Sequence, residues 1–143
     1  MARIRVAVDI EAPAERVWDD VRRIASHVEW MEDAVAIRFA SDQREGVGTA
    51  FACDTKVGPL RLTDRMVVTE WAPGERIGIR HEGAVTGTGR FTLSPAGAAT
   101  TFAWEEELTF PWWLGGPAGA AVGSRVLRLV WRRNLRNLRR RFA

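Results

Sequence analysis

Three ionisable side chains, Asp64, His81 and Glu106, each fall in phase with the apolar residues of an alternating stretch. Alternation with a period of two places such residues on one face of a β-strand. If these faces turn inward, the three groups lie in an apolar pocket, where they would orient a bound ligand. Desolvation there would raise the pKa of Glu106 and suit it to acid–base chemistry. These three residues are therefore the candidate catalytic groups.

A second interpretation of the same residues stays open. If the strand ends protrude, or if a bulge reverses the register, the three side chains are solvated or paired with arginine. A slip of one residue moves every side chain of a strand to the opposite face. Alternation therefore predicts which residues share a face, and leaves open which face is the inner one.

Other chemistries find little support in the sequence. Cys53 is the only cysteine, which excludes an internal disulfide and a cysteine zinc site. It has no catalytic partner nearby in the sequence, so we interpret it as a buried thiol. The two histidines and the acidic residues show no metal-ligand spacing. We expect neither a metal nor a cofactor.

The elements that must position these groups follow from the periodicity and the turn signals. A strand at 4–10 precedes one or two short helices, the first of which begins near Pro13. A series of alternating stretches separated by glycine and proline turns then indicates an antiparallel meander; we place its strands at 35–39, 51–57, 60–71, 77–81, 87–93 and 102–110. The last quarter predicts one long helix over 118–142, with an apolar stripe on one face.

One antiparallel sheet needs one face covered, and the long helix is the only element large enough to do so. We therefore expect a single α+β domain over 1–143, with a curved sheet of about seven strands wrapped around the C-terminal helix. Its 143 residues suffice for a substantial core. The most apolar stretch, 110–123, is too short to span a bilayer, and the N-terminus does not resemble a signal peptide. A soluble, cytoplasmic protein is expected.

The charge is unevenly distributed. The chain has 21 basic and 18 acidic side chains, but residues 125–143 hold eight arginines and no acid. Three interpretations of this arginine-rich helix face remain: a solvated surface, a contact for anionic lipid headgroups, or a nucleic-acid contact. The acidic remainder of the chain disfavours nucleic acid.

The ordered set of motifs resembles the START/birch-pollen-allergen (SRPBCC) superfamily, and within it the polyketide cyclase/dehydrase-like branch. The resemblance rests on VDIEAPAERVWDDV, HVEWMEDAVAI, VVTEWAPGERI and GTGRFTLSPAGAATTFAWEEEL, followed by FPWW, a glycine–proline loop and the long helix. It implies the helix-grip fold and a deep cavity between the sheet and the helix. Members of the family bind lipids, sterols, polyketides or quinones there, and some catalyse reactions.

Binding or transport of a small hydrophobic ligand, such as a lipid, polyketide or quinone, is thus the first functional hypothesis. The predicted ligand-binding residues are Trp30, Phe51, Met66, His81, Phe91, Phe102, Trp104, Glu106, Leu127 and Trp131. The first alternative is a polyketide cyclase, aromatase or dehydratase. Cyclase relatives steer polyketides with pocket arginines and hydroxyl groups such as tyrosine, but this chain has no tyrosine, and Arg65, Arg80 and Arg90 are phased outward. The second alternative is an interaction protein that uses the arginine face.

Two tryptophans, Trp112 and Trp113, stand between the last predicted strand and the long helix. An exposed Trp-Trp tip would be able to touch a membrane while a lipid enters the cavity, because indole rings favour the interface. The alternative is that the two rings close the end of the core.

Overall fold

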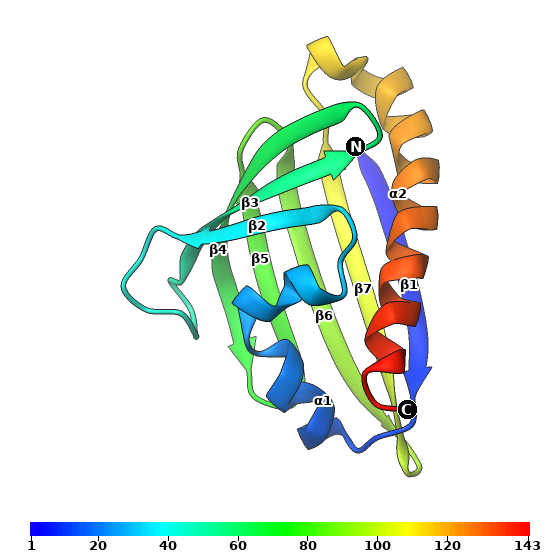
Figure 1. Ribbon diagram of the computed structural model, residues 1–143. Coiled ribbons are helices and arrows are strands. Elements are labelled where there is room, and N and C mark those ends of the chain that lie inside the picture. The colour runs from blue at the N-terminus through cyan, green and yellow to red at the C-terminus, as the bar shows by residue number, and fades with distance from the viewer.

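Seven strands form one antiparallel sheet in the order β1-β7-β6-β5-β4-β3-β2 in the computed structural model, which describes residues 1–143 (Figure 1). The strands are β1 (Ala2–Ile10), β2 (Ala34–Phe39), β3 (Ala50–Val57), β4 (Leu60–Ala72), β5 (Arg76–Glu82), β6 (Thr86–Ala96) and β7 (Ala99–Thr109). The first strand pairs with the last, so β1 and β7, the two strands farthest apart in sequence, are neighbours at one edge of the sheet. The predicted helix-grip architecture is confirmed.

Two short helices connect β1 to the opposite edge of the sheet. They are α1 (Ala14–Val21) and the 3₁₀ helix η1 (Ile24–Glu29). The helix α1 begins after Pro13, whose φ of −67° suits a helix start and whose carbonyl accepts hydrogen bonds from the N–H groups of Arg16 and Val17. Its buried face is apolar apart from Asp20. The segment formed by α1 and η1 therefore covers one end of the inner face of the sheet on its way from β1 to β2.

The long helix α2 (Gly116–Arg140) lies along β1, and the sheet curls round toward it, so that Asp33, directly before β2, contacts Asn134 of α2 (Figure 1). Trp131, Leu135 and Leu138 of the predicted apolar stripe are buried. The helix begins two residues before the predicted Ala118, directly after the 3₁₀ helix η2 (Trp112–Leu114). Gly115 takes the left-handed conformation that turns the chain, and Pro117 occupies the first turn, which needs no N–H donor there.

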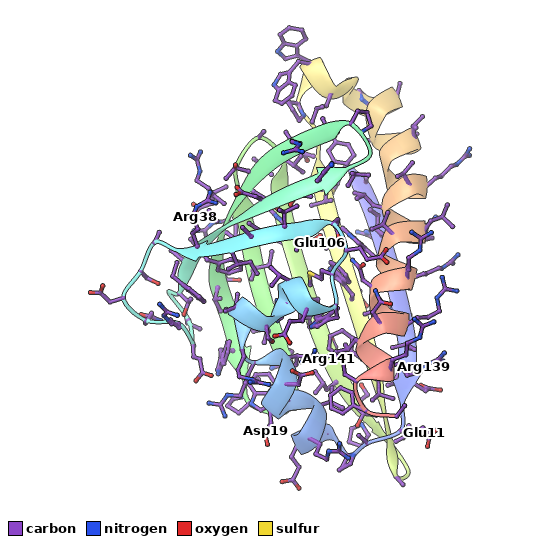
Figure 2. All side chains as sticks on the ribbon, viewed as in Figure 1. Glu11, Asp19, Arg38, Glu106, Arg139 and Arg141 are labelled. Atoms are coloured by element: carbon purple, nitrogen blue, oxygen red, sulfur yellow. The ribbon has the colours of Figure 1, made fainter.

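The C-terminal end of α2 is fastened to the short helices by Arg141. Its Nε and Nη2 lie 2.7 and 2.8 Å from the two carboxylate oxygens of Asp20, and its Nη1 lies 3.3 Å from Glu29. In Figure 2, Arg141 lies beside the α1 region, whereas Arg139 points outward. The hydrogen bonds from Arg141 lower the pKa of Asp20, although partial burial opposes this. These ion pairs hold the C-terminal end of α2 against α1 and η1.

Apolar residues of β1, α1, the inner sheet face and α2 form one buried cluster. No helix in the structure combines the length and the apolar character needed to cross a membrane.

Candidate functional site

A cavity of about 350 Å³ lies between the inner face of the sheet, the η1–β2 segment and the first half of α2. Of the 30 residues that line it, 21 are hydrophobic. It exists because α2 packs along β1 at the edge of the curved sheet and α1 packs chiefly on β6 and β7, so most of the inner face of β3 to β5 has no helix packed directly upon it. The wall is therefore apolar, with a few polar groups set into it.

The predicted trio of ionisable side chains meets on this wall. His81 of β5 stands between two carboxylates: its Nδ1 lies 2.9 Å from Oδ2 of Asp64 on β4, and its Nε2 lies 2.6 Å from Oε1 of Glu106 on β7. All three residues line the cavity. In Figure 2, Glu106 lies inside the fold, whereas Arg38 lies at the periphery.

The contact between Glu106 and His81 depends on β6, the strand between them. Glu106 pairs with Gly89, and His81 pairs with Gly87, so neither opposing position on β6 carries a side chain. A Cβ atom at Gly89 would lie 2.2 Å from Oε1 of Glu106, far inside van der Waals contact. Glycine at position 89 thus allows the Glu106 carboxylate to lie across β6 and reach the imidazole.

The environment of His81 favours its protonated form. Burial by itself would lower the pKa of His81, but the charge of Glu106 and the hydrogen bonds to Asp64 and Glu106 outweigh it and raise the pKa to about 10. At neutral pH both ring nitrogens therefore donate, one to each carboxylate. Burial also raises the pKa of Glu106. The Glu106 carboxylate and Nε2 of His81 therefore share the proton that lies between them.

A second polar cluster fixes α2 to the start of β2. Asp33 accepts hydrogen bonds from Nδ2 of Asn134 at 2.7 Å and from Nε1 of Trp131 at 3.3 Å. The side-chain oxygen of Asn134 in turn accepts the backbone N–H of Glu32 at 2.9 Å. Asn134 is fully buried, so these hydrogen bonds meet the requirement that buried polar groups be paired. The cluster holds Trp131 in place on the cavity wall.

Trp131 forms an aromatic wall with a sheet residue. Its ring stacks on that of Trp104, with centroids 4.3 Å apart and planes inclined by 14°. Phe91 meets Trp104 edge-on at 5.4 Å. All three rings line the cavity and give a ligand a rigid, apolar surface.

Comparison with known proteins identifies the family of this chain. The sequence profile described as "Polyketide cyclase / dehydrase and lipid transport" matches residues 1–143. The chain belongs to this family. A search of the curated proteins found no match.

Several solved structures share the fold of this family member, although their sequences are less than 20% identical to it. The protein TTHA0849 from Thermus thermophilus is 18% identical, with a TM-score of 0.82, over 98% of this chain and 96% of that one. A START superfamily protein from Mycobacterium smegmatis is 14% identical, with a TM-score of 0.78, over 99% and 97%. DynU16, encoded in the dynemicin biosynthetic locus, is 19% identical, with a TM-score of 0.69, over 98% of this chain and 46% of its own.

Most of the residues predicted to touch a ligand lie on the cavity wall: Phe51, Met66, His81, Phe91, Trp104, Glu106, Leu127 and Trp131. Trp30 and Phe102 do not. Both are fully buried in the core, where Trp30 packs against Phe91, Phe102 and Trp104. Their large rings support the aromatic wall from the side away from the cavity.

The residues that sequence reasoning left out of the site are of two kinds. Leu62 and Ile79 share the alternation of Asp64 and His81, so the same pattern places them on the wall. Asp33 and His27 had no such signal, because they lie at the end of a turn and in a short 3₁₀ helix. Burial lowers the pKa of His27 to about 4, and its Nε2–H donates to the carbonyl of Val21 at 2.8 Å. His27 is thus neutral and adds no charge to the wall.

The other candidate groups are placed as follows. Cys53 lies on the wall, and burial raises the pKa of its thiol to about 11, which leaves it protonated and weakly reactive. Arg65 and Arg80 are exposed, and the exposed Arg90 pairs with Glu70 at 3.3 Å. Trp112 and Trp113 are 86% and 53% exposed, so they do not close the core.

Proposed function

We propose that this family member binds a small hydrophobic molecule in the cavity between the sheet and α2. The observation that supports this most strongly is an apolar cavity of about 350 Å³ with a buried His–carboxylate cluster on its wall. A protein interior normally packs without voids of this size, and a large apolar pocket with few polar groups is typical of a ligand site. A ligand that buries about 200 Å² of apolar surface would gain roughly 5 kcal/mol before the costs of association.

The test uses N-phenyl-1-naphthylamine, a neutral apolar fluorophore, and two leucines of α2. Leu127 lines the cavity, whereas Leu129 is 63% exposed on the other side of the helix. We expect saturable binding of the fluorophore to the wild type and to Leu129→Trp, and an affinity about tenfold or more lower in Leu127→Trp, because the indole would fill the cavity. Equal affinities in both variants, or no saturable binding, would refute the proposal.

A second candidate function is acid–base catalysis on a bound polyketide-like ketone. The observation in its favour is the Asp64–His81–Glu106 cluster, in which His81 and Glu106 are buried and share a proton on the wall of an apolar cavity. In a dehydration, a carboxylate would take the proton α to the carbonyl and the β-hydroxyl would leave, after protonation, as water. Wild-type protein should then convert 4-hydroxy-4-phenylbutan-2-one to its conjugated enone, and Glu106→Gln should not. No enone above the buffer rate would end this hypothesis.

We also propose that the protein contacts a membrane surface when it takes up its ligand. Trp112, Trp113 and Leu129 are exposed, and the arginines at 125, 132 and 136 are exposed on α2 without an acidic partner. Exposed indoles and unpaired arginines each favour an anionic lipid surface. The protein should co-sediment with phosphatidylglycerol vesicles at low salt and less with phosphatidylcholine vesicles. Trp112→Ala should weaken this binding, and equal sedimentation with both lipids would contradict the proposal.

A further inference from the structure

The wall of the cavity carries an excess of negative charge. Three carboxylates line it, those of Asp33, Asp64 and Glu106. His81 is the protonated group that faces them, and it stands between Asp64 and Glu106. One imidazolium against three carboxylates leaves the wall anionic.

The remaining basic residues of the wall do not offset this charge. His27 is buried and donates its Nε2–H to a backbone carbonyl, and its low pKa keeps it neutral. Arg90 contributes to the lining, but its guanidinium pairs with Glu70, and its side chain is more than half exposed on the strand face opposite Phe91. No arginine or lysine therefore offers a free charge to an anionic ligand inside the cavity.

One acceptor on the wall has no partner within the protein. Each carboxylate oxygen of Asp33 accepts a hydrogen bond, from Asn134 or from Trp131. Both oxygens of Asp64 lie within 3.1 Å of Nδ1 of His81. Glu106 uses Oε1 for His81, but its Oε2 makes no hydrogen bond, although the side chain is only 6% exposed. Oε2 keeps some accessible surface, since the only fully buried side-chain N or O atom without a partner is Nε1 of Trp30. Because Glu106 lines the cavity, a ligand group there can donate the hydrogen bond that the protein does not supply to Oε2.

We propose that the cavity selects a mainly apolar molecule whose polar head donates a hydrogen bond to Oε2 of Glu106 and carries no negative charge. A hydroxyl or an ammonium head satisfies this requirement. A fatty-acid carboxylate does not, because it brings a second negative charge beside Glu106 into a poorly solvated space. The inference rests on the proposed binding function and specifies the ligand class for the same cavity.

The experiment compares three ten-carbon compounds that differ only in the head: decan-1-ol, decylamine and decanoate. Each displaces bound N-phenyl-1-naphthylamine at pH 7, where the amine is an ammonium and the acid is a carboxylate. We expect decanol and decylamine each to bind about tenfold or more tightly than decanoate. The relative strength of decanol and decylamine tells whether hydroxyl or ammonium donors are preferred, and either order supports the inference.

Glu106→Gln should reduce the discrimination against decanoate to within about threefold, because the amide carries no charge. Glu105→Gln is the matched control: its carboxylate lies on the outer face of β7, paired with Arg5, and the control should keep the wild-type ratio. Circular dichroism checks that both variants are folded.

Three results would overturn the inference. In the first, decanoate binds as tightly as decanol. In the second, both glutamine variants show the same ratio as the wild type. In the third, the fluorophore binds and is excluded by Leu127→Trp, but none of the three compounds displaces it; the proposed function then stands and the head-group selection fails. If the fluorophore itself does not bind, the proposed function fails, and the inference fails with it.

Discussion

Replacing Glu106 by glutamine should lower the pKa of His81 by about 3. The substitution keeps the size of the side chain and a hydrogen-bond acceptor, but it removes the charge that lies 2.6 Å from Nε2 of His81. Two unit charges about 4 Å apart attract by about 4 kcal/mol at an effective dielectric constant of 20. At about 1.4 kcal/mol for each pH unit, this is the predicted change.

The chain suits the measurement because it contains only two histidines. A ¹⁵N NMR titration of the imidazole nitrogens follows both at once. In the wild type, His81 should titrate near pH 10, and His27, whose pKa is about 4, should stay neutral down to acidic pH. In Glu106→Gln, the pKa of His81 should move to about 7, still supported by Asp64, while that of His27 stays in place.

Glu105→Gln serves again as the control, because residue 105 points to the outer face of the sheet. Two results would refute the electrostatic reasoning. One is a wild-type His81 that titrates near the ordinary histidine value. The other is a pKa of His81 that changes by less than about 1 in Glu106→Gln, since Asp64 or the backbone would then be responsible for the proton's stability.

Three further outcomes are expected. The free energy of unfolding should fall by about 3 kcal/mol between pH 6.5 and 4, because the unfolded chain binds a proton at His27 before the folded chain does, and chemical denaturation of His27→Gln should lack this part of the pH dependence. Leu138→Ala should cost about 2–5 kcal/mol of stability by the same method, against less than about 0.5 kcal/mol for the exposed Leu129→Ala. Gly89→Ala should fold but push the Glu106 carboxylate aside, so NMR should show a lower pKa of His81; an unchanged value would contradict the role given to the glycine.

The sequence predicts most of the fold because its signals are local. Alternating apolar residues between glycine and proline turns locate the strands, and steps of three and four residues locate α2. The helix begins two residues earlier than the stripe suggests, because Gly116 and Pro117 carry no apolar signal although they satisfy the backbone of the first turn.

The site is predicted less completely, because it depends on contacts between distant segments. Alternation identifies Asp64, His81 and Glu106 as residues in phase with apolar neighbours, but their convergence requires the register across β4 to β7 and two glycines on β6. Asp33 meets Asn134 across about a hundred residues, and no local pattern reports such a pair. Trp30 and Phe102 are large and apolar like the residues of the wall, and only packing shows that they lie behind it.

The stacked pair of Trp104 and Trp131 gives the protein a spectroscopic property of its own. With ring planes inclined by only 14° and centroids 4.3 Å apart, the two indoles are close enough for their electronic transitions to couple as an exciton pair. We expect this pair to contribute a couplet to the ultraviolet circular dichroism, in addition to any from the edge-on pairs Trp18–Trp71 and Trp30–Trp104. A molecule that enters the cavity and tilts either ring would change this couplet, so occupancy can be followed without any label.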